Sequence, residues 1–215
     1  MSTPRNRSLQ SRFPRDVELA PATSDRRGEL LALAAQMFAE RGLRATTVRD
    51  IADSAGIQSG SLYHHFDSKE SMVDEILRGF LDDLLGRYRA IVAEDLGPRA
   101  TLETIVAVSF DAIDRQHAAV AIYQNEARYL ADQPRFGYIG ERWAEFRSLW
   151  LTILRDGIAD GSFRADLDVD LAYRFMRDTV WVSVGWYRPG GSASIQTVAE
   201  QYQSIVLDGI STRRR

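Results

Sequence analysis

The sequence predicts an all-α protein, with a small N-terminal helix-turn-helix domain followed by a larger helical domain. Apolar residues recur at the i, i+3 and i+4 spacing of helices along most of the 215 residues, and no segment has the alternation of a β-strand. Two short helical segments, separated by a turn that contains glycine, lie between residues 47 and 66. That spacing is typical of a helix-turn-helix unit.

The composition is that of a globular protein, with 45% hydrophobic and 27% charged residues and a net charge of −3. Cysteine is absent, which excludes disulfides, Cys-ligated zinc and thiol nucleophiles in this chain. With three His residues, we predict no metal site and no cofactor. No apolar stretch reaches the ~18 residues of a membrane span, and the N-terminus lacks the core of a secretory signal. We therefore expect a cytoplasmic protein without a membrane partner.

The N-terminal elements follow from local sequence signals. Residues 1–24 contain scattered arginines and prolines without helical periodicity, which predicts a flexible arm. Residues 25–72 are predicted to form the helix-turn-helix domain. Its first helix begins at Asp25 and ends at Gly42, a residue type that favours the conformation just after a helix. Its second helix begins at the capping-box pattern Thr47-Val48-Arg49-Asp50.

The next two helices complete this domain. Gly56 allows the chain to reverse after the second helix. Ser59 is predicted to cap the third helix, which runs to about Phe66, and residues 67–70 begin a long fourth helix that ends near Ala93. Two helices this short are not stable alone, so the first helix and the start of the fourth must complete their core.

Residues 73–215 are predicted to form the second, helical domain. Its further helices begin at Pro98, before Val120, at Pro134, after Asp168 and after Ser194. We expect Gly157 and Gly161 to end the helix from Pro134, and the helix after Asp168 to run to about Tyr187. All four Trp residues lie here, which suits a cavity for a bulky apolar ligand, although aromatic rings on helices usually belong to a core.

The third helix is the candidate recognition helix. Such a helix places its N-terminal residues against base edges in the major groove. Base contacts are therefore predicted for Gln58, Ser59, Gly60 and Ser61. Phosphate contacts are predicted for Tyr63, His64 and Lys69. Tyr63 has the alternative of a core-edge aromatic, and Thr47 is either a cap alone or a cap that also contacts phosphate.

Many residues between positions 27 and 77 recur in one known family at the same spacing. They include the runs Ala45-Thr46-Thr47-Val48, Asp50-Ile51-Ala52, Ala55-Gly56, Gly60-Ser61-Leu62-Tyr63-His64-His65-Phe66 and Ser68-Lys69-Glu70. This stretch resembles the DNA-binding domain of TetR-family transcriptional regulators. The resemblance implies nine to ten helices, a C-terminal ligand-binding and dimerisation domain, and a homodimer whose interface is built by the last two helices.

A closer resemblance extends over most of the chain. The runs 38–57, 59–66 and 169–191 are similar to an actinobacterial subfamily that represses genes for degradation of the last two steroid rings of cholesterol. This resemblance implies a palindromic DNA operator and an inducer that is a CoA thioester of an indane-dione propanoate fragment. A fatty acyl-CoA or another bulky hydrophobic ligand is the alternative effector.

The helix after Asp168 contains the candidate effector residues. It is apolar on nearly every side, which predicts burial, yet it includes Arg177, which has no acid at i±3 or i±4. A buried unpaired guanidinium is costly, so a partner outside the helix is expected: an acid, backbone carbonyls or an anionic ligand, unless the side chain is partly exposed. Trp181, one turn on, could stack on a ring system. Tyr123, Phe110 and Trp150 are further candidates, chosen for their size and mid-helix position.

The sequence disfavours two other classes of function. An enzyme of lipid or CoA metabolism is disfavoured, because the sequence has no nucleophile elbow, phosphate-binding glycine loop or metal-ligand cluster. An architectural DNA-binding protein would leave the large aromatic domain without a purpose. The sequence therefore predicts a ligand-responsive repressor and no enzymatic activity.

Overall fold

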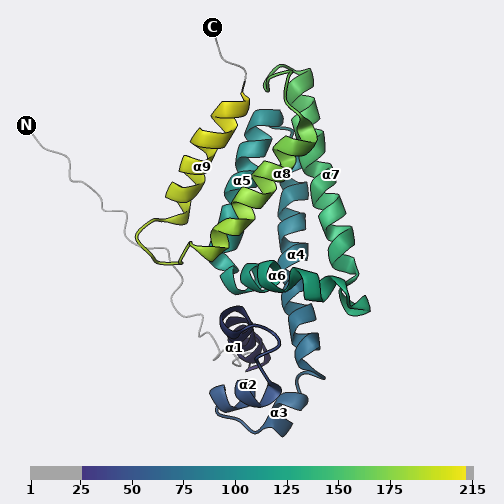
Figure 1. The fold of residues 1–215 in the computed structure, drawn as a ribbon, viewed down its shortest axis with the longest axis vertical. Coiled ribbons are helices and arrows are strands. Elements are labelled where there is room, and N and C mark those ends of the chain that lie inside the picture. Colours follow the sequence, from purple (N-terminus) through teal and green to yellow (C-terminus); the bar gives the residue numbers. More distant parts are fainter. Residues whose placement is uncertain (1–25, 212–215) are drawn as a thin grey trace, which may run out of the picture.

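A computed structural model describes residues 26–211, which form nine α-helices and two short 3₁₀ helices (Figure 1). No β-strand forms in this range, and one isolated bridge pairs Phe163 with Ser211. The predicted all-α fold is confirmed, whereas the predicted arm, residues 1–24, lies outside the described residues. The helices are α1 (Arg26–Arg41), α2 (Val48–Ser54), α3 (Ser59–Tyr63), α4 (Lys69–Ala93), α5 (Pro98–Arg115), α6 (His117–Ala131), η1 (Pro134–Phe136), α7 (Tyr138–Ala159), α8 (Val169–Val182), η2 (Ser183–Gly185) and α9 (Ile195–Ile210).

The helices form two parts that share α4 (Figure 1). α1, α2 and α3 gather at one end of the molecule, and α5 to α9 build the larger part. α4 begins beside α3 and continues among the helices of the larger part; its 25 residues span about 37 Å at 1.5 Å per residue. The boundary predicted between residues 72 and 73 falls inside this helix, so one continuous element joins the two parts.

The turns of the small part form where the local sequence predicts them. Gly42 and Gly56 have φ angles of 84° and 68°, in the left-handed region that favours glycine. The Thr47 hydroxyl accepts a hydrogen bond from the Asp50 N–H at 3.1 Å, and the Asp50 carboxylate accepts one from the Thr47 N–H at 2.8 Å. The predicted capping box is therefore present, and the side-chain hydrogen bond with Thr47 is the main cause that lowers the pKa of Asp50.

The third helix differs from its prediction at both ends. Gln58, not Ser59, is the N-cap residue, and its side chain makes no capping hydrogen bond. The helix ends at Tyr63, because the next residues form a turn that places the Phe66 ring in the core. The core of this part is made of buried apolar side chains from all four helices: Leu30, Phe38, Ile51, Leu62 and Met72.

Gly157 lies inside α7 and does not end it, so this prediction was wrong. The helix continues to Ala159, and Gly161, with φ 81°, follows its end. The Phe163 ring folds back over residue 157, where a Cβ would lie 2.2 Å from the Phe163 Cδ2 atom. Glycine is required here by tertiary packing. The start of α7 also differs, because Pro134 begins the short η1 helix that precedes it.

We expect Gly157→Ala to lower the free energy of unfolding by roughly 1–3 kcal/mol, the usual cost of overpacking a core. Urea denaturation would measure the loss. Gly86→Ala in α4 is the matched control, because a Cβ there meets nothing within 4 Å and alanine favours the helix. Equal effects of the two substitutions would contradict the packing role of Gly157.

α8 is exposed along one face of the isolated chain, although the sequence predicted burial on nearly every side. Leu171, Phe175 and Val182 are 51%, 68% and 61% exposed. The opposite face is buried, as Ala172, Met176 and Val180 show. α8 also ends at Val182, earlier than predicted, and continues as η2. The burial prediction therefore fails within one chain and leaves an apolar face without a partner in the described residues.

Candidate DNA-binding and effector sites

The predicted base-contacting residues lie at the start of α3, at the end of the molecule formed by the small part (Figure 1). Gln58, Gly60 and Ser61 are exposed, and Ser59 is half-buried. Tyr63 and His64, at the other end of α3, are exposed as well, with 55% of Tyr63 accessible. Because Leu62 is buried, α3 keeps one face in the core and presents the others outward.

Three of the predicted phosphate-contacting residues meet in one hollow. Thr47, Tyr63 and Lys69 line a space of about 450 Å³, at which the N-termini of α2 and α4 also lie. N–H groups at helix N-termini and the cations Arg49 and Lys69 attract anions, whereas the carboxylates of Asp67 and Glu70 in the same lining repel them. His64 does not line it. Thr47 acts as a cap in the structure, and its additional contact with phosphate stays a prediction.

Lys69 has a structural contact that the sequence did not predict. Its Nζ donates hydrogen bonds to the carbonyl oxygens of Leu43 at 2.8 Å and Thr46 at 3.2 Å. These bonds join the start of α4 to the loop between α1 and α2. An ammonium group has three donors, so one remains for a phosphate oxygen.

We expect Lys69→Met to lower the free energy of unfolding by about 2 kcal/mol, because two partly buried hydrogen bonds from a charged group are lost. Tyr63→Phe is the matched comparison: it removes one exposed hydroxyl, so it should leave stability unchanged and weaken DNA binding by about fivefold. Urea denaturation and fluorescence anisotropy with labelled operator DNA measure the two effects. A Tyr63→Phe protein that binds DNA as the wild type does would show that the Tyr63 hydroxyl makes no contact with phosphate.

An aromatic cavity of about 880 Å³ lies between α6, α7 and α8. Of the predicted effector residues, Tyr123, Arg177 and Trp181 line it together. Trp143 stacks on Tyr123, with ring centroids 5.1 Å apart, and meets Trp181 edge-on at 6.0 Å. Burial raises the pKa of Tyr123 to about 12, with the nearby Arg177 charge acting in the opposite direction. This cavity combines apolar ring faces with two cations, Arg177 and Arg147, the second of which is paired with Asp170; such a lining suits a ring-bearing anionic ligand.

Phe110 and Trp150 lie elsewhere, and we drop them from the candidate effector site. Phe110 is 2% exposed and packs on Tyr202 of α9, with ring centroids 5.3 Å apart. Trp150 is 3% exposed and packs on Tyr88 and Tyr173. Neither lines the aromatic cavity. Their size and mid-helix position were correct signals of core packing, but such signals do not tell which side of a helix faces a cavity.

Sequence reasoning missed Trp143 and Tyr173 as lining residues of the aromatic cavity. Trp143 is in the apolar stripe of α7, one turn before the buried Phe146. Tyr173 precedes Arg177 by four residues, and its ring centroid is 5.4 Å from the guanidinium carbon. The one available signal was the helical spacing of Tyr173 and Arg177, which places both on one face of α8.

Arg177 is partly exposed, which is the alternative that the sequence left open, and it has a partner within its own helix. Its Nε donates to the Asp178 Oδ1 at 2.6 Å, and its side chain is 38% exposed. A long arginine side chain can fold back to the next residue, which the i±3 and i±4 rule does not consider. Asp178 is 63% exposed, so this pair lies at the mouth of the cavity. A partner outside the helix, such as an anionic ligand, stays a prediction for Arg177.

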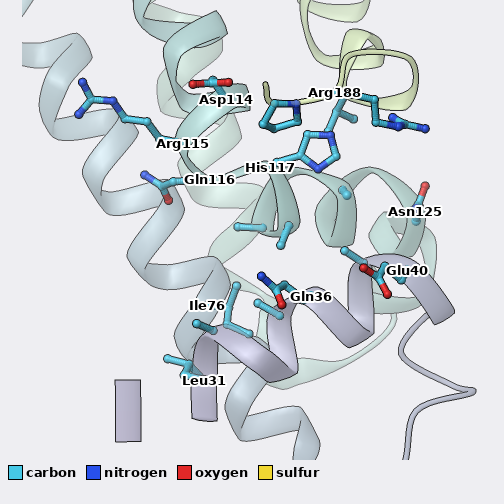
Figure 2. A pocket seen from close by; sticks show the side chains of 18 of the residues that line it. Leu31, Gln36, Glu40, Ile76, Asp114, Arg115, Gln116, His117, Asn125 and Arg188 are labelled. Atoms are coloured by element: carbon cyan, nitrogen blue, oxygen red, sulfur yellow. The ribbon is translucent and has the colours of Figure 1, made fainter. Parts of the chain in front are cut away.

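A second hollow, of about 970 Å³, lies on another side of α6 (Figure 2). Gln36 and Glu40 of α1 face it from one wall, and His117 and Arg188 from the opposite wall (Figure 2). Asp114, which also lines it, accepts a hydrogen bond from the Tyr187 hydroxyl at 2.5 Å. None of the predicted effector residues lines it. α6 therefore separates two hollows.

α6 also contacts the DNA-binding part directly. The Glu126 carboxylate accepts a hydrogen bond from the Leu43 N–H at 2.9 Å. The Arg44 guanidinium carbon lies 4.8 Å from the centroid of the Tyr129 ring. Along α6, the residues that line the aromatic cavity alternate with Glu126 and Tyr129. A single rigid helix therefore connects the aromatic cavity with the α1–α2 loop.

The small part is a helix-turn-helix domain, and the larger helical part contains a cavity. Together they define a one-chain transcriptional regulator that responds to a small molecule. The chain belongs to the TetR family. The family model described as "Bacterial regulatory proteins, tetR family" matches residues 30–76, and the one described as "Tetracyclin repressor-like, C-terminal domain" matches residues 95–210. TetR repressors bind DNA operators and typically form dimers.

Similar proteins narrow the class to repressors. The HTH-type transcriptional repressor KstR2 of Rhodococcus jostii strain RHA1 is 67% identical over 189 residues, which cover 88% of this chain and 93% of that protein. KstR2 of Mycobacterium tuberculosis strain H37Rv is 62% identical over 193 residues, or 90% and 96% of the two chains. The solved structure of the ketosteroid transcriptional regulator KstR2 of M. tuberculosis has a TM-score of 0.86 at 62% identity, covering 88% of this chain and 97% of that one.

These findings confirm the predicted resemblance to the TetR family and to an actinobacterial repressor subfamily. The protein is a TetR-type transcriptional repressor. Repressors of this family are not enzymes, which excludes the enzymatic alternative. Within residues 26–211, none of the helices is both long enough and apolar enough to span a membrane.

Proposed function

We propose that this protein represses genes for steroid-ring degradation, binds a palindromic operator as a homodimer, and is released by a CoA thioester of an indane-dione propanoate fragment. The observation that carries the proposal is the aromatic cavity with Arg177 at its mouth. Stacked rings suit a flat, fused ring system, and a guanidinium suits the phosphate or carboxyl oxygens of a charged carrier. The names of the similar repressors support the steroid assignment.

The exposed face of α8 supports the homodimer. Leu171, Phe175 and Val182 lie on one face of the helix, and Ile205 of α9 is 73% exposed. Apolar faces of this kind are covered by a partner in soluble proteins, and a two-fold axis lets the same face serve both subunits. A dimer presents two recognition helices to half-sites that are ~34–36 Å apart along the DNA, or a multiple of that distance.

The signal would pass through α6. A ligand that fills the aromatic cavity presses on Tyr123 and its neighbours, and the hollow on the other side of α6 gives the helix room to shift. Because Glu126 is bonded to the Leu43 N–H, such a shift displaces the α1–α2 loop and the DNA-binding part with it. A coupling free energy of ~1–3 kcal/mol is typical for switches of this kind.

Fluorescence anisotropy tests the proposal. Labelled DNA from upstream of the protein's own gene is bound at stated salt, and CoA thioesters of steroid-ring fragments and of long fatty acids are titrated in. Binding with a Kd of about 10⁻⁸ M, reversed by the steroid-fragment thioester alone, is the expected result. Release by fatty acyl-CoA would instead favour the alternative effector. Tight binding that no thioester reverses would remove both effector assignments and keep the repressor.

A further inference from the structure

Two aromatic contacts fix the register of α7 against α8, and these helices pack side by side (Figure 1). The Trp143 ring of α7 meets the Trp181 ring of α8 edge-on, with centroids 6.0 Å apart. Further along α7, the Trp150 ring meets the Tyr173 ring, with centroids 6.3 Å apart. Residue numbers therefore rise along α7 while they fall along the facing α8, as in an antiparallel pair of helices.

This register brings two arginines to the same level of the aromatic cavity. Arg147 lies one turn after Trp143 on α7, and Arg177 lies one turn before Trp181 on α8. Both arginine side chains line the cavity. Burial raises the pKa of Tyr173, and the charges of Arg177 and Arg147 both act in the opposite direction. Two positive charges therefore lie near the Tyr173 hydroxyl, beside the aromatic rings.

Each guanidinium group is paired with a carboxylate of α8. Arg177 is paired with Asp178, and Arg147 is paired with Asp170. Both side chains of the second pair are 52% exposed, and Arg147 lines the cavity whereas Asp170 does not. An exposed ion pair is weak, because water solvates both charges when they separate. An anion inside the cavity therefore replaces Asp170 at the Arg147 guanidinium at little cost.

The arginine pair lies at one end of the cavity lining that α7 provides. This lining runs from Ile139 to Arg147, about 12 Å at 1.5 Å per residue. At the other end, Ile139 and the neighbouring Phe136 are buried apolar side chains. An apolar group and a charged group of one ligand therefore have separate places in the cavity.

We propose that Arg147 and Arg177 together bind the diphosphate of a CoA-thioester effector, and that Asp170 competes with this diphosphate for Arg147. This inference rests on the proposed function, because it concerns the effector of that same cavity. A diphosphate has two adjacent negative charges, which match two guanidinium groups at one level of facing helices. Guanidinium groups bind phosphate oxygens through two parallel N–H bonds. The apolar end of the lining is then left for the acyl group.

The test compares three thioesters of the same steroid-ring fragment by isothermal titration calorimetry. The CoA thioester is complete, the dephospho-CoA thioester keeps the diphosphate but lacks the ribose phosphate, and the pantetheine thioester lacks both. We expect Arg147→Met to bind the two diphosphate-bearing thioesters roughly tenfold more weakly than the wild type does, and the pantetheine thioester equally well. Asp170→Asn should bind the two diphosphate-bearing thioesters about threefold more tightly, because the competing carboxylate is removed.

Arg142→Met is the matched control. Arg142 lies on the same helix and is paired with Asp82 of α4 at 2.9 Å, but it does not line the aromatic cavity. The substitution removes the same charge from the protein, and it should leave the affinities for all three thioesters unchanged. An equal weakening in Arg142→Met and Arg147→Met would show a long-range effect of net charge and overturn the inference.

Four other results also overturn the inference. A loss in Arg147→Met that disappears with the dephospho-CoA thioester assigns this arginine to the ribose phosphate. An equal loss with the pantetheine thioester shows that Arg147 does not bind the diphosphate. Weaker binding by Asp170→Asn is the result that a purely structural ion pair predicts, and the fourth result is that the wild type binds none of the thioesters. Failure of the proposed function is recognised separately by anisotropy, where thioesters that bind the protein do not release the operator.

Discussion

Arg177→Met should leave operator binding intact and raise the effector concentration needed for release by roughly tenfold to hundredfold, because charge-assisted hydrogen bonds to an anionic ligand are lost. The guanidinium is held at the cavity mouth by Asp178, at 2.6 Å, and by the Tyr173 ring. Methionine keeps the length and apolar stem of the side chain, so the cavity wall is preserved. Anisotropy with labelled operator, titrated with the thioester, gives both quantities.

Two further variants sharpen this prediction. Arg177→Lys retains the charge but loses the two-pronged geometry, so its response should fall between those of the wild type and Arg177→Met. Arg155→Met is the control, because Arg155 is exposed on α7 and lines neither hollow. If Arg177→Met releases DNA at the wild-type effector concentration, Arg177 has no role in effector binding.

Phe175→Glu should convert the proposed dimer to a monomer and weaken operator binding by at least about a hundredfold, since binding at one half-site loses the gain from two linked sites. Phe175 is 68% exposed and lies between Leu171 and Val182 on the apolar face of α8. In a two-fold interface the substitution places two carboxylates in one apolar patch, where neither has a counter-charge. Sedimentation velocity would measure the oligomeric state, and anisotropy the operator affinity.

Leu96→Glu is the matched control for the dimer. Leu96 is 45% exposed and lies in the connection between α4 and α5, outside α8. The same substitution there should leave both the dimer and operator binding unchanged. A Phe175→Glu protein that remains dimeric and binds operator within threefold of the wild type would place the interface on another surface.

Local signals explain why much of the small part was predictable. The capping box at residues 47–50 and the turns at Gly42 and Gly56 depend on residues adjacent in sequence, and each formed as expected. Ser59 was assigned as a cap because its residue type favours one. In the structure, Ser59 is the first residue of α3. The start of this helix is decided by the packing of Leu62 and Phe66 in the core.

The effector site was predictable in part, because helical periodicity identifies apolar positions but not their neighbours. Tyr123 of α6 and Arg177 and Trp181 of α8 line one cavity, while Phe110 and Trp150 occupy the core. Nothing in the spacing of Trp143 and Trp150, seven residues apart on one helix, distinguishes a cavity wall from a packed interior. That distinction depends on whether the helix opposite brings a side chain close enough to fill the space.

By itself, the sequence determined the all-α fold, the helix-turn-helix and the family, since these depend on periodicity, caps and residue spacing within short segments. Only the tertiary structure decided that Asp178 meets Arg177, that Phe163 needs a glycine at residue 157, and that Trp143 stacks on Tyr123. Each of these depends on the distance between particular atoms after the helices pack. Periodicity assigns a residue to a face, whereas packing decides what that face meets.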